Sequence, residues 1–158
     1  MTGPTLPGAI LLPDGCWVRG RGLRSGLRPG PLPDYGLYLG TGRLRRHSPP
    51  WAHRWIDWPD FLLPRNRFEA VGLIQDLHRR AQDGQRVEVA CGGGIGRTGT
   101  VIGCLAILAG HPVPDAVAWT RANYHRRAVE TPWQRRWIIR FGAAQSGVGM
   151  GSRRDRFR

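Results

Sequence analysis

The sequence predicts an α/β fold, with a central, mostly parallel mixed sheet, helices on both faces and functional residues at the carboxyl ends of the strands. Two observations support this prediction. Short apolar runs, bounded by glycine, proline or charged residues, are interspersed with longer segments in which apolar residues recur at helical spacing. One run, residues 87–90, leads through a glycine-rich loop into a nearly all-apolar helix over residues 98–108, which implies a helix buried on most sides.

The amino-terminal half is predicted to supply most of the strands. Two short apolar runs flank the turn Pro13-Asp14-Gly15, and together they predict a hairpin over residues 10–18. Residues 19–24 are rich in arginine and glycine and are predicted to form a basic loop. Two further strands are expected at residues 35–39 and 55–56, with a loop between them.

The second half is predicted to be mainly helical. Apolar residues at helical spacing predict a helix over residues 67–81, which Asp83-Gly84 brings to an end. Two more helices are expected at about residues 114–124 and 132–141. Each of them begins with a proline, which is favoured in the first turn of a helix.

The length of 158 residues fits a single domain. We expect this domain to cover residues 1–145 and to be followed by a disordered, arginine-rich tail at residues 146–158. No apolar run approaches the roughly 18 residues of a membrane-spanning helix, and the first residues lack the features of a secretory signal. The sequence therefore predicts a cytoplasmic protein without a membrane partner.

The net charge of +13 has two interpretations. All 24 basic residues are arginines, and the chain also has 23 glycines and 13 prolines, a composition that indicates the coding bias of a GC-rich genome. The same charge also fits a preference for acidic substrates or for nucleic acid. A nucleic-acid partner is thus a secondary interpretation, and the sequence carries no signal for an oligomeric state.

The three cysteines and the histidines give no metal signature. Cys16, Cys91 and Cys104 cannot all pair, and none has the spacing of a zinc ligand, so we expect neither a metal site nor a cofactor. Cys104 is predicted to be a small core residue, and Cys16 is a possible resolving thiol for an oxidised Cys91. His78 is expected to be solvated or to cap a helix.

The segment Cys91-Gly-Gly-Gly-Ile-Gly-Arg97-Thr98 carries the chemistry. Glycines let a loop turn successive backbone N–H groups toward one anion, and the following helix adds its positive N-terminal end. Arg97 can donate two parallel hydrogen bonds to phosphate oxygens. The same positive surroundings favour the thiolate form of Cys91, and Thr98 can donate a hydrogen bond to the sulfur. The residues predicted to bind substrate are Gly92, Gly93, Gly94, Ile95, Gly96 and Arg97.

These residues resemble the signature loop of the protein tyrosine phosphatases and dual-specificity phosphatases, in particular the small, single-domain bacterial members. The resemblance implies a phosphatase-like fold and hydrolysis of phosphotyrosine in proteins, with Cys91 as the nucleophile of a phosphocysteine intermediate. The family usually has a histidine before the cysteine. Because Ala90 stands there in this sequence, we expect weaker activation of the thiolate.

Two further segments resemble the family. Trp58-Pro59-Asp60 lies about thirty residues before Cys91, as the family's mobile acid loop does, which implies that Asp60 protonates the leaving group; Asp57 is the rival acid. Residues 130–134 resemble the segment in which a glutamine aligns the hydrolytic water. Gln134 holds that position, although it is equally readable as a surface residue in the first turn of a helix.

Other activities stay open on the sequence alone. Phosphoinositide-directed relatives tend to carry lysines in the loop, and residues 92–96 contain none. The arginine excess leaves an RNA 5′-phosphate or a small phosphorylated metabolite as an alternative substrate. Ala90 leaves a catalytically weak phosphate-binding module as a further alternative.

Overall fold

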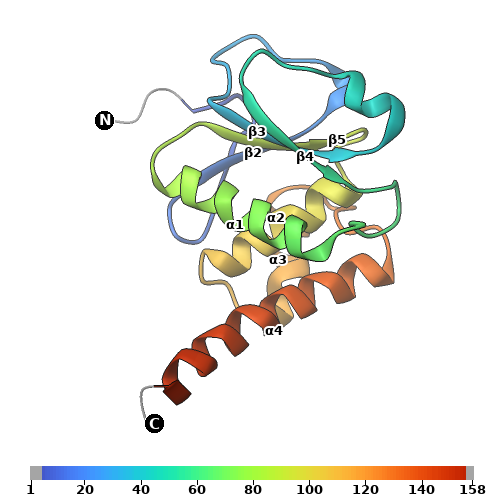
Figure 1. Ribbon diagram of the computed structural model, residues 1–158. Helices are drawn as coiled ribbons and strands as arrows, with labels where there is room; N and C mark the ends of the chain where they lie inside the picture. The colour runs from blue at the N-terminus through green and yellow to red at the C-terminus, as the bar shows by residue number, and fades with distance from the viewer. Residues whose placement is uncertain (1–4, 156–158) are drawn as a thin grey trace.

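The computed structural model describes residues 5–155, with side chains as far as Gly147. Its five strands form one mixed sheet in the order β1-β2-β5-β3-β4 (Figure 1). Only β1 and β2 pair in antiparallel fashion, and the other neighbours are parallel. The predicted fold class is therefore confirmed. The strands are β1 Ile10–Leu11, β2 Trp17–Gly22, β3 Tyr35–Gly40, β4 Ala52–Asp57 and β5 Val87–Cys91.

The sequence predicted helices on both faces of the sheet, and this part of the prediction is wrong. All four α-helices lie on one face (Figure 1). The opposite face is covered by two short 3-10 helices, whose Leu23 and Leu44 pack with Tyr38 and Ala90. The connections that follow β2 and β3, residues 23–34 and 41–51, contain five prolines, which disfavour a longer helix, and they use these turns instead. The helices are η1 Leu23–Ser25, η2 Gly42–Arg46, α1 Arg67–Gln82, α2 Gly96–Leu108, η3 Val113–Asp115, α3 Ala116–Asn123 and α4 Pro132–Asp155.

Helix α1 forms where the apolar spacing predicted it. The side chain of Asn66 caps its start by accepting a hydrogen bond from the backbone N–H of Glu69 at 3.0 Å. Its buried stripe includes Ile74 and Leu77, which face the sheet. The helix ends before Gly84, which has a positive φ of 85°.

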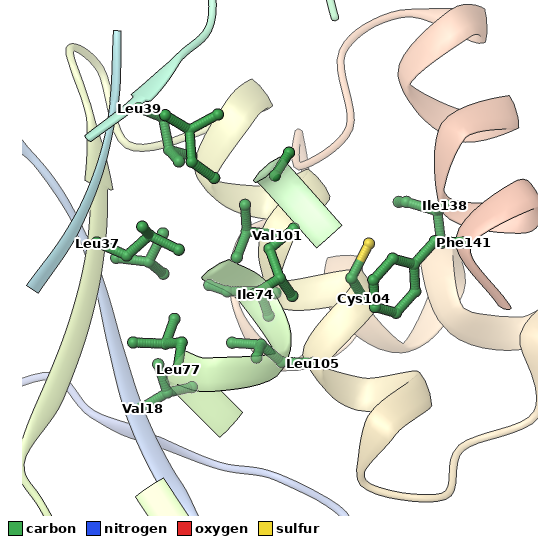
Figure 2. Packing of buried hydrophobic residues seen from close by; sticks show 14 of the residues in the cluster. Val18, Leu37, Leu39, Ile74, Leu77, Val101, Cys104, Leu105, Ile138 and Phe141 are labelled. Atoms are coloured by element: carbon green, nitrogen blue, oxygen red, sulfur yellow. The ribbon is translucent and has the colours of Figure 1, made fainter. Parts of the chain in front are cut away.

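The core lies between the sheet and helix α2. Leu37 of β3 points to the side of α1 and α2 and belongs to one buried cluster with Ile74 and Val101 (Figure 2). Helix α2 is buried along most of its length, as its composition predicted. Cys104 on α2 faces Phe141 of α4 and is a core residue, in agreement with the prediction.

Residues 19–22 belong to strand β2, which corrects the prediction of a basic loop. Arg19 pairs with Glu88 of β5 in parallel register, and the pairing continues to the end of both strands. The physical reason is a buried ion-pair network. The fully buried carboxylate of Glu88 accepts hydrogen bonds from Arg19, Arg21 and Tyr38, so these arginines are neutralised within the sheet.

Helix α4 extends to Asp155, which corrects both its predicted end near Phe141 and the predicted disorder from Ser146. The segment contains no proline that would interrupt the helix, and each further residue adds one backbone hydrogen bond. The last part of the predicted tail, residues 156–158, lies outside the described residues. None of the helices within residues 5–155 combines the length and apolar content that a membrane span requires.

The Glu88 network should matter more for stability than any ion pair at the surface. Glu88→Ala should lower the free energy of unfolding by about 3–5 kcal/mol, because it leaves Arg19 buried without a counter-charge. Chemical denaturation of both proteins measures this difference. The control is Asp76→Ala, which removes the partly exposed pair with Arg80 and should cost about 0.5 kcal/mol. If Glu88→Ala and Asp76→Ala lowered the free energy of unfolding equally, the Glu88 network would not be the more important one for stability.

Candidate active site

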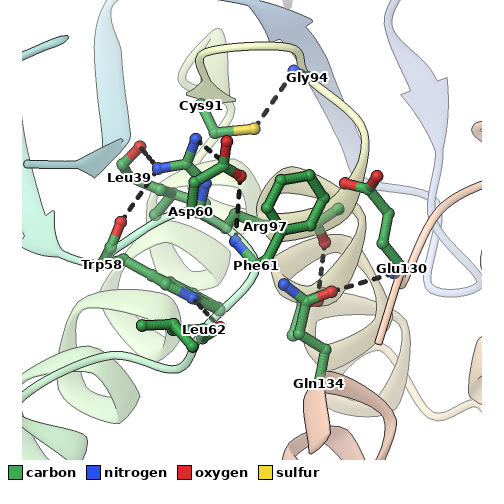
Figure 3. A network of polar contacts seen from close by, with 12 residues as sticks. Leu39, Trp58, Asp60, Phe61, Leu62, Cys91, Gly94, Arg97, Glu130 and Gln134 are labelled. Atoms are coloured by element: carbon green, nitrogen blue, oxygen red, sulfur yellow. Dashed lines mark hydrogen bonds and ion pairs between the residues drawn. The ribbon is translucent and has the colours of Figure 1, made fainter. Parts of the chain in front are cut away.

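The loop of residues 92–96 is held from outside by hydrogen bonds to its carbonyl groups. The carbonyl of Gly92 accepts from the backbone N–H of Arg24 at 3.2 Å, and that of Gly94 accepts from the hydroxyl of Tyr124. Carbonyls bonded on the outer side leave the loop amides directed to the inner side. The N–H of Gly94 accordingly donates to Sγ of Cys91 at 3.2 Å (Figure 3).

Gly94 has to be a glycine in this arrangement. Its φ is +76°, and a Cβ would lie 2.5 Å from the backbone of Arg21 and of Gly22 at the end of β2. A side chain at this position would be strained in conformation and would also displace the strand that supports the loop. The prediction that glycines allow this loop to close around an anion therefore has a specific structural basis at Gly94.

Tyr124 supports the loop and was not found by sequence reasoning. Burial, with a contribution from the charge of Cys91, raises the pKa of Tyr124 above its usual value, so its hydroxyl stays protonated and remains a donor to the Gly94 carbonyl. Ala90, where the family usually has histidine, packs against Tyr38 and Leu23 on the other face of the sheet. Tyr124 and the Arg24 backbone thus give the loop support that does not depend on residue 90.

Arg97 is fixed by backbone carbonyls on one side and contacts only the carboxylate of Asp60 on the other. It is 4% exposed, and its Nη1 donates to the carbonyls of Trp58 at 3.0 Å and Leu39 at 3.4 Å. Nη2 lies 3.4 Å from Oδ1 of Asp60, while Nε has no partner among the described residues. The Nε–Nη2 edge of the guanidinium is thus available for two parallel hydrogen bonds to a tetrahedral anion.

The structure brings Asp60 to the site and not Asp57. The preceding Trp58 is fully buried, and its indole N–H donates to the carbonyl of Leu62 at 2.8 Å, which anchors the loop. Asp60 is half exposed and faces Arg97 (Figure 3). The carboxylate of Asp57 instead pairs with Arg65 at 3.3 Å. Asp60 is thus the carboxylate beside Arg97, and its role as the acid stays a prediction.

Phe61 and Trp133 form an apolar wall next to Asp60. Phe61 has a positive φ of 60°, unusual for a residue with a side chain, and its carbonyl accepts a hydrogen bond from the indole of Trp133. Phe61 is 52% exposed and Trp133 is 40% exposed. Exposed aromatic rings beside a polar centre are suited to contact an apolar part of a ligand.

Gln134 is buried, which excludes the reading of a surface glutamine. Its backbone N–H donates to Oγ1 of Thr131 at 3.1 Å, and its Oε1 accepts from the backbone N–H of Glu130 at 3.0 Å (Figure 3). The residue therefore helps to cap helix α4. Its Nε2 is buried and has no partner among the described residues, so one amide N–H₂ group is left for a water molecule or a substrate.

One residue of the site differs from expectation, and another was not predicted. Thr98 is fully buried, but its hydroxyl makes no hydrogen bond within the described residues, whereas the N–H of Gly94 donates to the sulfur. Glu130 was not singled out from the sequence. Its carboxylate lies against Gly96 at the start of α2, where it leaves no room for a Cβ.

A comparison with family models adds to this geometry. Residues 64–140 match the model described as "Swiss Army Knife protein, DSP-PTPase phosphatase domain". The match includes Cys91, Arg97 and Gln134 and begins after Asp60. The chain belongs to the superfamily of dual-specificity and protein tyrosine phosphatases.

Similar proteins are known from an archaeal genome and from crystal structures. The uncharacterized proteins MJ0215 and MJECL20 of Methanocaldococcus jannaschii are 29% and 30% identical to this phosphatase, and each match covers 73% of this chain. The matches cover 81% and 88% of those two proteins. The bacterial origin that the resemblance implied stays a prediction.

The structural neighbours share the fold of this phosphatase. Tk-PTP in its active form is 20% identical, with a TM-score of 0.66 over 87% of this chain and 97% of Tk-PTP. Kinase associated phosphatase, with serine in place of its catalytic cysteine, is 14% identical, with a TM-score of 0.65 over 87% of this chain and 95% of that one. A mouse putative dual specificity phosphatase complexed with zinc tungstate is 12% identical, with a TM-score of 0.60 over 94% and 95%.

The other two cysteines of this phosphatase lie outside the site. Cys16 directly precedes β2, roughly 20 Å along the chain from Gly22, the residue that pairs with Cys91, which is too far for a resolving thiol. His78 is buried, not solvated, and its Nε2 lies 2.7 Å from Oδ2 of Asp14. Asp14, Cys16 and His78 bring their ligand atoms within 4.8 Å of one another, a proximity that their sequence spacing does not indicate.

The environment of the thiols predicts selective alkylation. Burial, followed by Asp14, raises the pKa of Cys16 to about 11, and burial raises the pKa of Cys104 well above its usual value. At pH 7 both are neutral thiols, so iodoacetate should modify Cys91 alone, and inorganic phosphate should protect it. Mass spectrometry of the labelled peptides measures this. Labelling of Cys16 should grow only as the pH approaches 11. Equal labelling of all three cysteines at pH 7 would contradict the prediction that Cys91 alone is reactive.

Proposed function

We propose that this phosphatase domain hydrolyses phosphate monoesters through a phosphocysteine intermediate on Cys91, and that its preferred substrate is phosphotyrosine in proteins. One observation carries the proposal. The sulfur of Cys91 accepts the N–H of Gly94, and the guanidinium of Arg97, whose Nε has no partner among the described residues, lies 3.4 Å from the carboxylate of Asp60, so the nucleophile, an anion ligand and an acid lie together (Figure 3).

The first chemical step follows from this placement. The thiolate of Cys91 attacks phosphorus, while the loop amides and Arg97 hold the equatorial oxygens. As the S–P bond forms, the bond from phosphorus to the leaving oxygen breaks. Protonated Asp60 gives its proton to that oxygen, so the product leaves as a neutral hydroxyl compound.

The second step returns the enzyme to its starting state. The buried amide of Gln134 orients a water molecule, and Asp60, now a carboxylate, accepts a proton from it. The oxygen of the water attacks phosphorus, the S–P bond breaks, and inorganic phosphate and the Cys91 thiolate are formed. Gln134 can take this part because its Oε1 is fixed by the Glu130 backbone while its Nε2 is unpaired.

The apolar wall supports an aryl phosphate as substrate. Phe61 and Trp133 are exposed beside the acid loop, where a phosphotyrosine ring bound at Cys91 would have an aromatic partner. An aryl leaving group with a pKa of about 10 also gains from protonation by Asp60. Neither feature is needed by a module that only binds phosphate.

Replacing the nucleophile separates an enzyme from a binding module. Cys91→Ser should abolish turnover of p-nitrophenyl phosphate and keep vanadate binding, because serine preserves the shape of the loop but is far less ionised. Steady-state rates and calorimetric titration measure the two properties. Turnover at the rate of the unmodified enzyme would rule out the covalent mechanism.

Replacing the acid tests the role of Asp60. Asp60→Asn should reduce turnover of a phosphotyrosine peptide by about 10²- to 10⁴-fold, the usual contribution of a general acid. The loss should be smaller with an activated leaving group, which departs without a proton. Asp57→Asn is the matched control and should have little effect, because Asp57 pairs with Arg65. A loss that depends on the leaving group in Asp57→Asn, and not in Asp60→Asn, would reverse the assignment.

A further inference from the structure

An open pocket adjoins the catalytic centre at the carboxyl ends of three strands. Its volume is about 390 Å³, and it shares Arg97 and Asp60 with the catalytic site. The other walls come from the connections that follow β2 and β3 and include Arg24, Arg43 and His47. These connections carry the 3-10 helices η1 and η2 that cover the helix-free face of the sheet.

Arg24 lies directly over the catalytic loop. Its backbone N–H binds the carbonyl of Gly92, and its guanidinium carbon would be only 2.9 Å from a Cβ at Gly92, the residue after the nucleophile. Arg43 belongs to η2, which Leu44 fixes by packing against Gly40 at the end of β3. Both arginines are thus carried by segments that are anchored to the sheet.

The charges of this pocket are unbalanced. Arg97 pairs with Asp60 at 3.4 Å. Arg24 and Arg43 have no carboxylate partner among the side chains that the structure describes. A phosphate monoester at Cys91 occupies the loop amides and Arg97 and does not neutralise these two cations. Guanidinium groups next to a phosphate site favour a further phosphoryl group, which they can bind through two hydrogen bonds.

We propose that Arg24 and Arg43 form a second anion subsite, which binds a second phosphoryl group carried next to the scissile one on the same small molecule. The proposal rests on the proposed function of Cys91 and extends it to vicinal bisphosphates and terminal diphosphates. The short distance is required because the pocket shares Arg97 and Asp60 with the catalytic centre. The phosphate of a neighbouring residue in a peptide would be attached further away.

Binding to the Cys91→Ser protein tests the subsite without any turnover. Calorimetry should give methylenebisphosphonate an affinity at least about tenfold higher than methylphosphonate, the size of effect that one added charge-assisted contact produces. Adding Arg24→Gln and Arg43→Gln should remove most of this ratio. The matched control is Arg46→Gln, which takes the same charge from η2 but does not line the pocket, and it should preserve the ratio.

The outcomes distinguish this proposal from the proposed function. Equal affinities for the two phosphonates, or a ratio that survives the loss of Arg24 and Arg43, overturn the subsite whether or not Cys91 is catalytic. Turnover assays then show which kind of molecule carries the second phosphoryl group. An advantage of 2,3-bisphosphoglycerate over 3-phosphoglycerate that depends on Arg24 supports the proposal. Such an advantage found only for a doubly phosphorylated peptide over its singly phosphorylated form assigns the subsite to peptides and overturns the small-molecule assignment.

Discussion

The active site depends on hydrogen bonds that hold the catalytic loop from its outer side. The loop can direct its amides to one anion only while its carbonyls have partners elsewhere. The 3-10 helix η1, which follows β2, supplies one partner through the Arg24 backbone, and helix α3 is followed directly by the other, Tyr124. Gly94 then allows the close approach of β2. The nucleophile is thus positioned by elements that carry no chemistry of their own.

Arg97 joins the loop to the strands beside it. Through Nη1 it binds backbone carbonyls at the end of β3 and in the acid loop, so a single guanidinium connects β3, the segment with Asp60 and helix α2. The same group keeps its other edge for substrate. Below the loop, the buried Glu88 pairs β5 with the arginines of β2 and so fixes the strand that supports Gly94. Arg97 therefore has both a structural and a catalytic role, whereas the ion pairs of Glu88 are structural.

Local patterns in the sequence predicted what local physics determines. The bounds of α1, the buried α2, the glycine loop and the Trp58-Pro59-Asp60 segment each depend on residues close together in the chain. The basic loop at residues 19–24 was predicted wrongly because the partner of its arginines, Glu88, is nearly seventy residues away. Tyr124, the contact of His78 with Asp14 and the burial of Gln134 likewise arise from tertiary packing. Arg24 was visible in the sequence only as one arginine among 24 basic residues.

The proposed mechanism requires that phosphate be transferred to the sulfur of Cys91. Rapid acid quench of the Asp60→Asn protein during turnover of an activated aryl phosphate, followed by peptide mapping, tests it most directly. We predict one phosphoryl group on the peptide that contains Cys91, with a ³¹P resonance of an S–P bond, and none on the Cys91→Ser protein. Phosphate on a histidine, or none on Cys91 while product forms in a burst, would contradict the account.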